Sequence, residues 1–346
     1  MKVLVTGAGG FLGQYVVKQL TARGDRVRAL CRTDGDALKA QGVDVARGDL
    51  RDRAAVVEAC RGIDAVFHIG GMSGIGGCWR DYYQSNVLGT RHIVEGCLAH
   101  GVGRLVYTSS PSVTFDGRNQ EGVDESTPYG GPIASEAGSP ASGKRWLCHY
   151  ARSKALAERH VLTANGTGGL HCCALRPHLI WGPGDRHLIP GLLANAEAGR
   201  LWRVGSGANM IDTVYVENAA SAHLLAAAAL NPGSPAAGQA YFISQGEPVN
   251  CWAWIDEILS LVGLPSVRRS MSPRMAWLVG AAYEWTYRLL RRREEPPMTR
   301  FLAAQLSHSH YFNIERARRD LGYHPAISMA EGMQRLAASL RQCGTV

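Results

Sequence analysis

The sequence lacks the cysteine patterns that mark metal-binding and disulfide-rich proteins. Its 346 residues include nine cysteines, an odd number, at irregular spacing and with no Cys-x-x-Cys pair. Disulfide frameworks and zinc sites usually show even numbers or paired spacings, so we expect neither, and no bound metal. Reduced, mostly buried thiols are typical of a protein in a reducing compartment. The expected location is therefore the cytoplasm.

Long apolar runs are missing as well. No stretch of about 18 uncharged apolar residues occurs, which predicts no transmembrane helix, and the first residues lack the pattern of a signal peptide. The formal net charge is +8, but no nucleic-acid-binding motif accompanies it, so nucleic acid is not an expected partner. At 46% hydrophobic and 19% charged residues, the composition is that of an ordinary globular protein.

Short apolar runs alternate with helical patterns through the first 110 residues. Such alternation predicts right-handed βαβ units and a doubly wound α/β fold, whose parallel sheet is covered on both faces. Residues 111–146 are rich in glycine, proline and serine and lack periodicity, which predicts a long functional loop. Strands are predicted at 3–5, 27–31, 43–46, 65–68 and 105–108, and helices at 11–23, 54–60 and 82–100.

Beyond this loop the pattern becomes mixed. A helix is predicted at 150–162, a strand at 170–175 and another helix at 188–199. We divide the chain into a sheet domain at 1–184 and a smaller, mixed α+β C-terminal lobe at 185–346, with some segments of the lobe returning to the first domain. The sheet domain is expected to bind a cofactor, and the lobe a substrate.

A glycine-rich turn follows the first predicted strand. Gly7, Gly10 and Gly13 are spaced Gly-x-x-Gly-x-x-Gly, and the next predicted helix begins at Phe11 and Leu12. Glycine at these positions permits a tight turn, a close backbone approach to a pyrophosphate, and close packing of helix on strand. The free N–H groups at the start of the helix would face the phosphates. The pattern therefore predicts a Rossmann sheet that binds a dinucleotide.

The residue after the second predicted strand indicates which dinucleotide is bound. An acidic residue there would hold the ribose hydroxyls of NAD, but this chain has Arg32 instead. A guanidinium favours the 2′-phosphate of NADP(H). Asp49, after the third predicted strand, is placed to reach the adenine edge. The alternative is that Asp49 caps the helix that follows it.

Tyr150 and Lys154 are four residues apart in a predicted helix, so both project from one face. A tyrosine has a pKa of about 10, and a neighbouring ammonium would lower that pKa toward the working range of a catalytic acid or base. A hydroxyl at the end of a strand is also needed to orient a carbonyl, and the stretch 105–110 at the fifth predicted strand supplies candidates for it. A Tyr-x-x-x-Lys pair alone often arises by chance, but behind a glycine turn and a serine-rich strand end it predicts hydride transfer coupled to proton transfer.

Together these motifs resemble the extended short-chain dehydrogenase/reductase family over essentially the whole chain. The resemblance implies that Ser110 orients the substrate, that Tyr150 donates the proton, and that Lys154 activates Tyr150 and contacts the cofactor. It also implies cofactor contacts from Leu50, Ile69, Gly70, Asn86 and Pro177. The matching stretches are 6–13, 48–50, 64–68, 86–90, 107–110, Tyr150 with Lys154, and 176–184.

Within that family the sequence is most similar to the 3β-hydroxysteroid dehydrogenase branch, and within the branch to the 2-alkyl-3-oxoalkanoate reductases of bacterial olefin biosynthesis. This similarity implies NADPH-dependent reduction of a β-keto acid with two long alkyl chains to the 2-alkyl-3-hydroxyalkanoic acid. Alternatives are an NAD(P)-dependent 3β-hydroxysteroid or 4-carboxysterol dehydrogenase, a UDP-sugar epimerase, and an NADP-sensing binding protein without catalysis. The similar stretches are 104–114, 175–184, 240–248 and 295–303.

The residues that would meet the substrate are less defined. His178, Arg186 and Tyr215 are candidates for substrate contact. Arg186, Arg118 and Arg145 are candidates for binding its carboxylate. Each is also interpretable as an ordinary loop, surface or packing residue. The expected partners are the long-chain β-keto acid, a second copy of the chain in a homodimer, and other enzymes of the same pathway.

Residues 271–293 combine apolar and aromatic side chains with an arginine cluster at their end. One interpretation is a helix of the lobe packed on its core. The other is an interfacial helix, or a lid over a long-chain substrate, which would place the protein peripherally at the inner membrane face.

Overall fold

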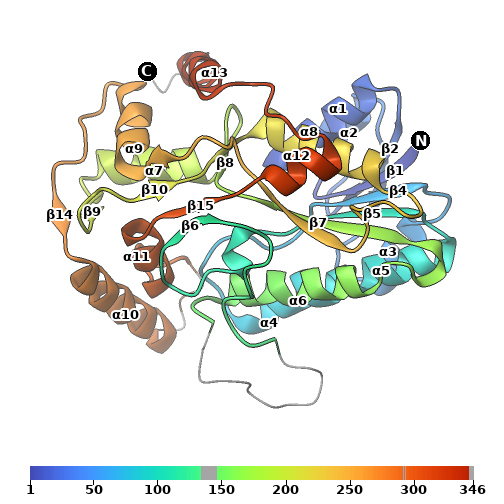
Figure 1. Cartoon of the computed structure of the whole chain (residues 1–346), viewed down its shortest axis with the longest axis horizontal. Coiled ribbons are helices and arrows are strands. Elements are labelled where there is room, and N and C mark those ends of the chain that lie inside the picture. The colour runs from blue at the N-terminus through green and yellow to red at the C-terminus, as the bar shows by residue number, and fades with distance from the viewer. Residues whose placement is uncertain (134–145, 291, 293, 343–346) are drawn as a thin grey trace.

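A computed structural model describes residues 1–133, 146–290, 292 and 294–342 of the chain. A central sheet lies between two layers of helices, and a second group of helices and short strands lies beside it (Figure 1). The predicted α/β fold with a smaller mixed lobe is confirmed.

The central sheet has seven parallel strands in the order β12-β7-β5-β4-β1-β2-β3. Its inner strands are almost wholly buried apolar runs, as expected where helices cover both faces. The chain builds outward from β1 in one direction and from β4 in the other, so the strand order reverses between them. Ligands of doubly wound sheets bind at this reversal, beyond the carboxyl ends of the strands. The strands are β1 (Lys2–Thr6), β2 (Arg26–Cys31), β3 (Asp44–Arg47), β4 (Ala65–His68), β5 (Arg104–Thr108), β7 (His171–Pro177) and β12 (Gln239–Ile243).

Two hydrophobic clusters hold helices against the two faces of this sheet. On one face, Val16 and Leu20 of α1 (Phe11–Ala22) are fully buried together with five alanines of α8 (Val216–Ala229). The other face is covered by α3 (Arg53–Ala59), α5 (Gly89–His100) and α6 (His149–Thr163). Small residues on α8 let it approach α1 closely, which positions the glycine turn between β1 and α1.

A third cluster, rich in tryptophan, forms the core of the smaller lobe. Its sheet has the order β13-β10-β15-β6, which joins strands far apart in sequence. The helices of the lobe are α7 (Leu188–Glu197), α9 (Cys251–Ser260), α10 (Pro273–Leu289), α11 (Arg300–Ser307) and α13 (Met329–Gln342). Its strands are β6 (Gln120–Val123), β9 (Arg203–Val204), β10 (Met210–Ile211), β13 (Val249–Asn250), β14 (Ser270–Met271) and β15 (His310–Phe312).

The remaining elements are short connections between these layers. They are α2 (Asp36–Lys39), α4 (Trp79–Tyr82), a π-helix (Tyr83–Leu88), 3-10 turns at Pro111–Val113 and Thr167–Gly169, β8 (Ile180–Trp181), β11 (Val214–Tyr215) and α12 (Glu315–Leu321).

Two predicted segments differ from the structure. The helical segment predicted at 82–100 begins at Trp79 and contains the π-helix, which the apolar pattern did not indicate. The loop predicted at 111–146 contains β6, whose partner β15 lies about 190 residues further along. Residues 134–145 of that loop lie outside the described residues. Strand β12 returns to the central sheet beside β7; the domain division at residue 184 stays a prediction.

Candidate active site

Glycine is sterically required at two of the three glycine positions of the turn. Gly7 has a φ of 71°, and a Cβ added there would lie 2.8 Å from the Cα of Gly70. A Cβ on Gly13 would lie 2.0 Å from the carbonyl oxygen of Gly7. Gly10 has an ordinary extended backbone, and its added Cβ would meet only that same oxygen, at 3.1 Å. The fold therefore accounts for Gly7 and Gly13 but not for Gly10.

The start of α1 fits a phosphate group. Gly10 is the residue before the helix, and within the described residues no side chain caps its first N–H groups. These groups, with the positive end of a 12-residue helix, form an anion site at the carboxyl end of β1. A side chain at Gly10 would project over this site. The arrangement fits the pyrophosphate of a dinucleotide.

Arg32 and Asp49 face each other beyond the ends of β2 and β3. Arg32 is exposed. Asp49 receives two hydrogen bonds from the Arg51 guanidinium, at 2.9 and 2.8 Å, and these, with a smaller contribution from Arg32, lower the pKa of its carboxyl group. The cap of α3 is Asp52, which accepts from the N–H of Ala55. The alternative role of Asp49 as the helix cap is therefore wrong.

A buried histidine joins the glycine turn to the loop after β4. The Gly70 N–H donates to Thr6 Oγ1 (3.0 Å), which lies 2.7 Å from His68 Nδ1. On the other side, His68 Nε2 lies 2.9 Å from Thr90 Oγ1, which donates to the carbonyl of Asn86 (2.6 Å). Because the Thr90 proton is used there, Nε2 carries the imidazole proton. Burial, with the charge of a nearby lysine, lowers the pKa of His68 to about 3, so the ring is neutral.

The π-helix directs the side chain of Asn86 toward α6. Its side-chain amide donates to the Met72 carbonyl (3.0 Å) and to Ser153 Oγ (2.9 Å), and its oxygen accepts from the Met72 N–H (2.6 Å). Ser153 in turn donates to the Tyr150 carbonyl (2.8 Å). Asn86 is 2% exposed, so these bonds are shielded from water. They connect the loop after β4 with the first turn of α6.

Lys154 is buried beneath the end of β5. Its Nζ donates to the Thr108 carbonyl (2.5 Å) and lies 4.5 Å from the centre of the Tyr107 ring. Burial lowers the pKa of Lys154 to about 7, and the negative Glu158 one turn further along α6 only partly opposes this. Lys154 therefore exchanges its proton near neutral pH.

Tyr150 and Ser110 meet between the first turn of α6 and the end of β5. The Ser110 hydroxyl accepts from the N–H and the hydroxyl of Ser112, at 3.2 and 2.9 Å. Burial raises the pKa of Tyr150 to about 12, although a hydrogen bond with Ser110 opposes the rise. The expectation that Lys154 lowers this pKa is wrong for the structure described, because the amine is turned toward Thr108. Tyr150 is thus protonated at neutral pH, which suits a proton donor.

The three candidate substrate residues are not brought together. His178 is buried and bonded through Nε2 to His310 Nδ1 (2.7 Å). Tyr215 is fully buried and packs on Trp181, with ring centres 5.3 Å apart, which favours its interpretation as a packing residue. Arg186 is exposed.

Of the carboxylate candidates, Arg118 is exposed on the described part of the loop. Arg145 lies outside the described residues.

Several residues that hold the site together were missed by the sequence analysis. Thr108 accepts from Lys154 and bonds through its hydroxyl to His223 of α8 (2.7 Å). His178 rests on His310, which donates to the Gln305 carbonyl (3.0 Å). The available signal was a polar residue at the end of a buried strand, but their partners lie up to 132 residues away and leave no local pattern.

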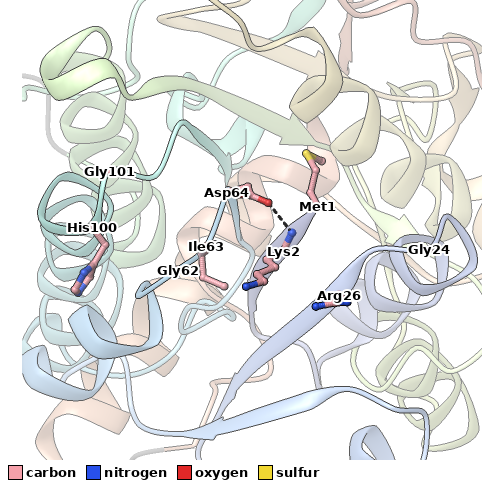
Figure 2. A pocket seen from close by; sticks show the side chains of 9 residues that line it. All are labelled: Met1, Lys2, Gly24, Arg26, Gly62, Ile63, Asp64, His100 and Gly101. Carbon is pink, nitrogen blue, oxygen red and sulfur yellow. Dashed lines mark hydrogen bonds between the residues drawn. The ribbon is translucent and has the colours of Figure 1, made fainter.

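A separate hollow lies at the amino ends of the strands, opposite the candidate site (Figure 2). Lys2 and Arg26 line it at the starts of β1 and β2, together with Asp64 and His100 before β4 and β5. The N–H of Lys2 donates to Asp64 there (2.7 Å). Because doubly wound sheets bind ligands at the carboxyl ends of their strands, this hollow is not the candidate active site.

Comparison with known proteins identifies the family. The model of the 3-beta hydroxysteroid dehydrogenase/isomerase family matches residues 4–273, which include the glycine turn and the Ser110, Tyr150 and Lys154 constellation. The chain belongs to this family. The expectation that it is an oxidoreductase is thereby confirmed.

Individual curated proteins are similar to this chain over nearly its whole length. It is 47% identical over 342 residues to the 2-alkyl-3-oxoalkanoate reductase of Stenotrophomonas maltophilia, covering 98% of this chain and 99% of the relative. It is 44% identical over 343 residues to the protein of the same name from Shewanella oneidensis, covering 97% and 85%. Among solved structures, it resembles MoeE5 in complex with UDP-glucose and NAD, with a TM-score of 0.71, 26% identity and 99% coverage of each chain.

Proposed function

We propose that this protein is an NADPH-dependent reductase that converts a long-chain 2-alkyl-3-oxoalkanoic acid into the 2-alkyl-3-hydroxyalkanoic acid, in the biosynthesis of olefin or β-lactone hydrocarbons. The proposed substrate rests on the identity of 44–47% with two reductases of that name, which extends through the lobe as well as the sheet. The proposed reaction type is supported by the positions of Ser110, Tyr150 and Lys154. Ser110 hydrogen-bonds Tyr150, and Lys154 hydrogen-bonds the last residue of β5.

Each of the three residues has a distinct part in the proposed reaction. When bound, NADPH supplies the hydride. Ser110 donates a hydrogen bond to the ketone oxygen and holds it against Tyr150, which gives that oxygen its hydroxyl proton as negative charge develops there. Lys154, with a pKa lowered to about 7, is a proton source near neutral pH, and its amine would have to leave the Thr108 carbonyl to reach Tyr150. Asn86 and Ser153 hold the backbone of Tyr150 in place.

The cofactor is held by residues at the carboxyl ends of β1 to β4. The N–H groups of Phe11, Leu12 and Gly13 would bind the pyrophosphate, and Gly10 would leave room for it. Leu50 packs beside Gly70, so that the two loops after β3 and β4 close on the cofactor together. Further contacts come from Ile69 and from Pro177 at the end of β7.

The choice of NADP over NAD depends on the adenosine end of the site. Arg32 is exposed there, and its charge adds to the field around Asp49. A free guanidinium at this corner favours a 2′-phosphate. Asp49, held by Arg51, remains placed for the adenine edge.

A second candidate is the oxidation of a 3β-hydroxysteroid or 4-carboxysterol. The matching family model, which is named for hydroxysteroid dehydrogenases, favours it. The same three residues would serve that reaction in reverse, with Tyr150 accepting the proton. The group that gives a proton in reduction takes it back in oxidation, so Tyr150 serves both candidates. The higher identity to the reductases, 47% against 34% for a hydroxysteroid dehydrogenase/decarboxylase, favours the first candidate.

The proposed partners follow from the substrate. The long-chain β-keto acid is the ligand of the lobe. Of the three candidate contacts, Arg186 is exposed, whereas His178 and Tyr215 are buried and would need their neighbours to move. We also propose that the protein forms a homodimer and associates with other enzymes of the same pathway. The proposed location is the cytoplasm.

The test is NADPH consumption with a panel of β-keto acids, half of them carrying a 2-alkyl branch, beside 3β-hydroxysteroids with NAD or NADP. We expect a strong preference for the branched acids. Tyr150→Phe should lower turnover by about 100-fold or more, as for loss of a general acid, and leave NADPH binding unchanged by fluorescence titration. Faster turnover of sterols, or near wild-type turnover by Tyr150→Phe, would overturn the proposal.

A further inference from the structure

Helix α10 presents apolar side chains to solvent on the face opposite its packed side. Met275, Leu278, Trp285 and Leu289 are 54%, 57%, 67% and 64% exposed. Their spacing of three, seven and four residues places them in one stripe along the helix. We call these four residues the outer stripe. A helix on the surface of a globular protein normally shows polar residues there.

The packed side of α10 shows that this orientation is built in. Ala276 and Gly280 are its buried residues. A Cβ added to Gly280 would lie 2.6 Å from the Thr299 carbonyl carbon, so the helix rests directly on the start of α11. Rotating the outer stripe inward would bring large side chains against that backbone. The stripe therefore stays exposed in the folded chain.

Positive charge lines the ends of the outer stripe. Arg274, Arg288 and Arg292 are exposed around it. Of the nearby acidic groups, Glu284 accepts from Arg300 (2.7 Å) and Glu295 accepts from the N–H of Ile75 (2.6 Å). Glu294 is exposed and offsets one of the three arginine charges. The surface is thus apolar along its centre and cationic at its ends.

This combination matches one kind of partner, the surface of an anionic bilayer. Helices that lie in the membrane interface carry tryptophan and leucine on one face and arginine beside it. In the described part of the chain, no helix is long and apolar enough to cross a membrane. A docked α10 would therefore lie along the surface rather than span it. A protein partner would need complementary acidic groups around an apolar groove.

We propose that α10 docks this protein on an anionic lipid bilayer, with the outer stripe inserted between the headgroups and Arg274 and Arg288 contacting them. The docking depends only on the surface of α10. It also has a consequence that rests on the proposed function, because the segment after α10 reaches the candidate active site.

That consequence concerns access of the substrate. Glu295 holds Ile75 and Gly76 in the loop after β4. From the end of α4, the Tyr82 hydroxyl donates to the carbonyl of Gly76 in the same loop (2.5 Å), and the Tyr82 ring lies 6.4 Å from that of Tyr150. A substrate with long alkyl chains, dissolved in the bilayer, would reach Tyr150 from the side on which α10 docks.

The test is co-sedimentation of the full chain with phosphatidylglycerol/phosphatidylcholine vesicles and with vesicles of phosphatidylcholine alone. We expect binding to the anionic vesicles that weakens with salt. The double variant Trp285→Ser/Leu289→Ser should lose it by more than about tenfold, because two large apolar side chains no longer insert. Leu98→Ser, at a 38% exposed leucine on α5, is the matched control and should bind as wild type.

Three outcomes would overturn the docking proposal. The first is that the wild type does not bind anionic vesicles, and the second is that the double variant binds them as well as the wild type does. The third is self-association in analytical ultracentrifugation that the double variant abolishes, because the outer stripe would then be a contact between copies of the chain. Both variants should keep wild-type turnover of a soluble short-chain β-keto acid. If wild type reduces no β-keto acid yet binds vesicles, the proposed function fails while docking stands.

Discussion

At the scale of single residues, the glycine turn separates what folding needs from what a ligand needs. Gly7 and Gly13 are crowded by the protein's own backbone, whereas Gly10 faces the start of α1 with little around it. The sequence pattern treats the three glycines alike. Their different surroundings give a prediction that distinguishes their roles.

Gly13→Ala should destabilise the fold by ~1–3 kcal/mol, since its Cβ must displace the backbone at Gly7. Gly10→Ala should lower the free energy of unfolding by only about 1 kcal/mol, because alanine is a poorer helix cap than glycine but its Cβ would meet no atom closer than the Gly7 carbonyl oxygen, at 3.1 Å. It should nevertheless weaken NADPH binding about tenfold or more, equivalent to ~1.4 kcal/mol. Urea unfolding and fluorescence titration check the two effects. Unchanged NADPH affinity in Gly10→Ala would place the pyrophosphate elsewhere.

Arg32→Ala should raise the KM for NADPH about tenfold, equivalent to ~1.4 kcal/mol for a lost charge-assisted contact, and leave the KM for NADH nearly unchanged. Steady-state kinetics with both cofactors measure this. Arg47→Ala is the matched control, since Arg47 is also exposed nearby but lies 3.4 Å from Asp34. An unchanged KM for NADPH in Arg32→Ala would contradict the assignment of NADP.

At the scale of elements, the π-helix at Tyr83–Leu88 decides how the site is assembled. One additional residue in a turn rotates the side chains that follow it, and π-turns are frequent at functional sites for this reason. Here the turn lets Asn86 reach both the loop after β4 and Ser153 on α6. The sequence indicated a helix and a role for Asn86, but not the geometry that connects them.

Asn86→Ala should therefore affect catalysis as well as stability. The buried N–H of Met72 would lose its acceptor, at a cost of ~1–3 kcal/mol, and the first turn of α6 would lose its link to the loop. We expect kcat to fall while the KM for NADPH changes less, measured by kinetics beside urea unfolding. Asn231→Ala, at an exposed asparagine, should alter neither. If Asn86→Ala lowered the free energy of unfolding but kept the wild-type kcat, Asn86 would have only a structural role.

At the scale of the whole molecule, buried histidines connect the sheet with its covering layers. Burial lowers the pKa of His68 to about 3 and of His223 and His310 to about 4, and holds that of His178 well below its usual value. Each ring is neutral in the folded protein and accepts a proton on unfolding at mildly acidic pH. The hydrogen bonds that position the site are thus also a source of acid sensitivity.

Stability should be highest above pH ~6.5 and fall as the pH drops toward 4. The folded pKa values lie below the unfolded value of about 6.5, so the unfolded state binds more protons in this window. Each histidine contributes up to about 1.4 kcal/mol per pH unit, while Asp212, whose pKa burial raises to about 6, offsets part of the slope. Urea midpoints from pH 7 to 4.5 measure this.

Two variants control this prediction. His223→Gln should reduce the slope by about one proton, whereas His324→Gln, at an exposed histidine, should leave it unchanged. A urea midpoint that does not move between pH 7 and 5 would contradict the role of the buried histidines.

The sequence by itself determined the features that depend on neighbours in the chain. The alternation of strands and helices, the glycine turn, and the four-residue spacing of Tyr150 and Lys154 are local patterns, and they predicted the doubly wound fold and the oxidoreductase family. Arg32 and Asp49 were visible as residue types at strand ends, though the pairing of Asp49 with Arg51 was not.

Only the tertiary structure decided what depends on contacts between distant segments. The pairing of β6 with β15, the turning of Lys154 toward Thr108 and the resulting high pKa of Tyr150 arise from packing and burial. So does the outward direction of the apolar stripe on α10, because periodicity shows that a helix has two faces but not which face meets its neighbour. These properties follow from desolvation and close contact, which no local pattern encodes.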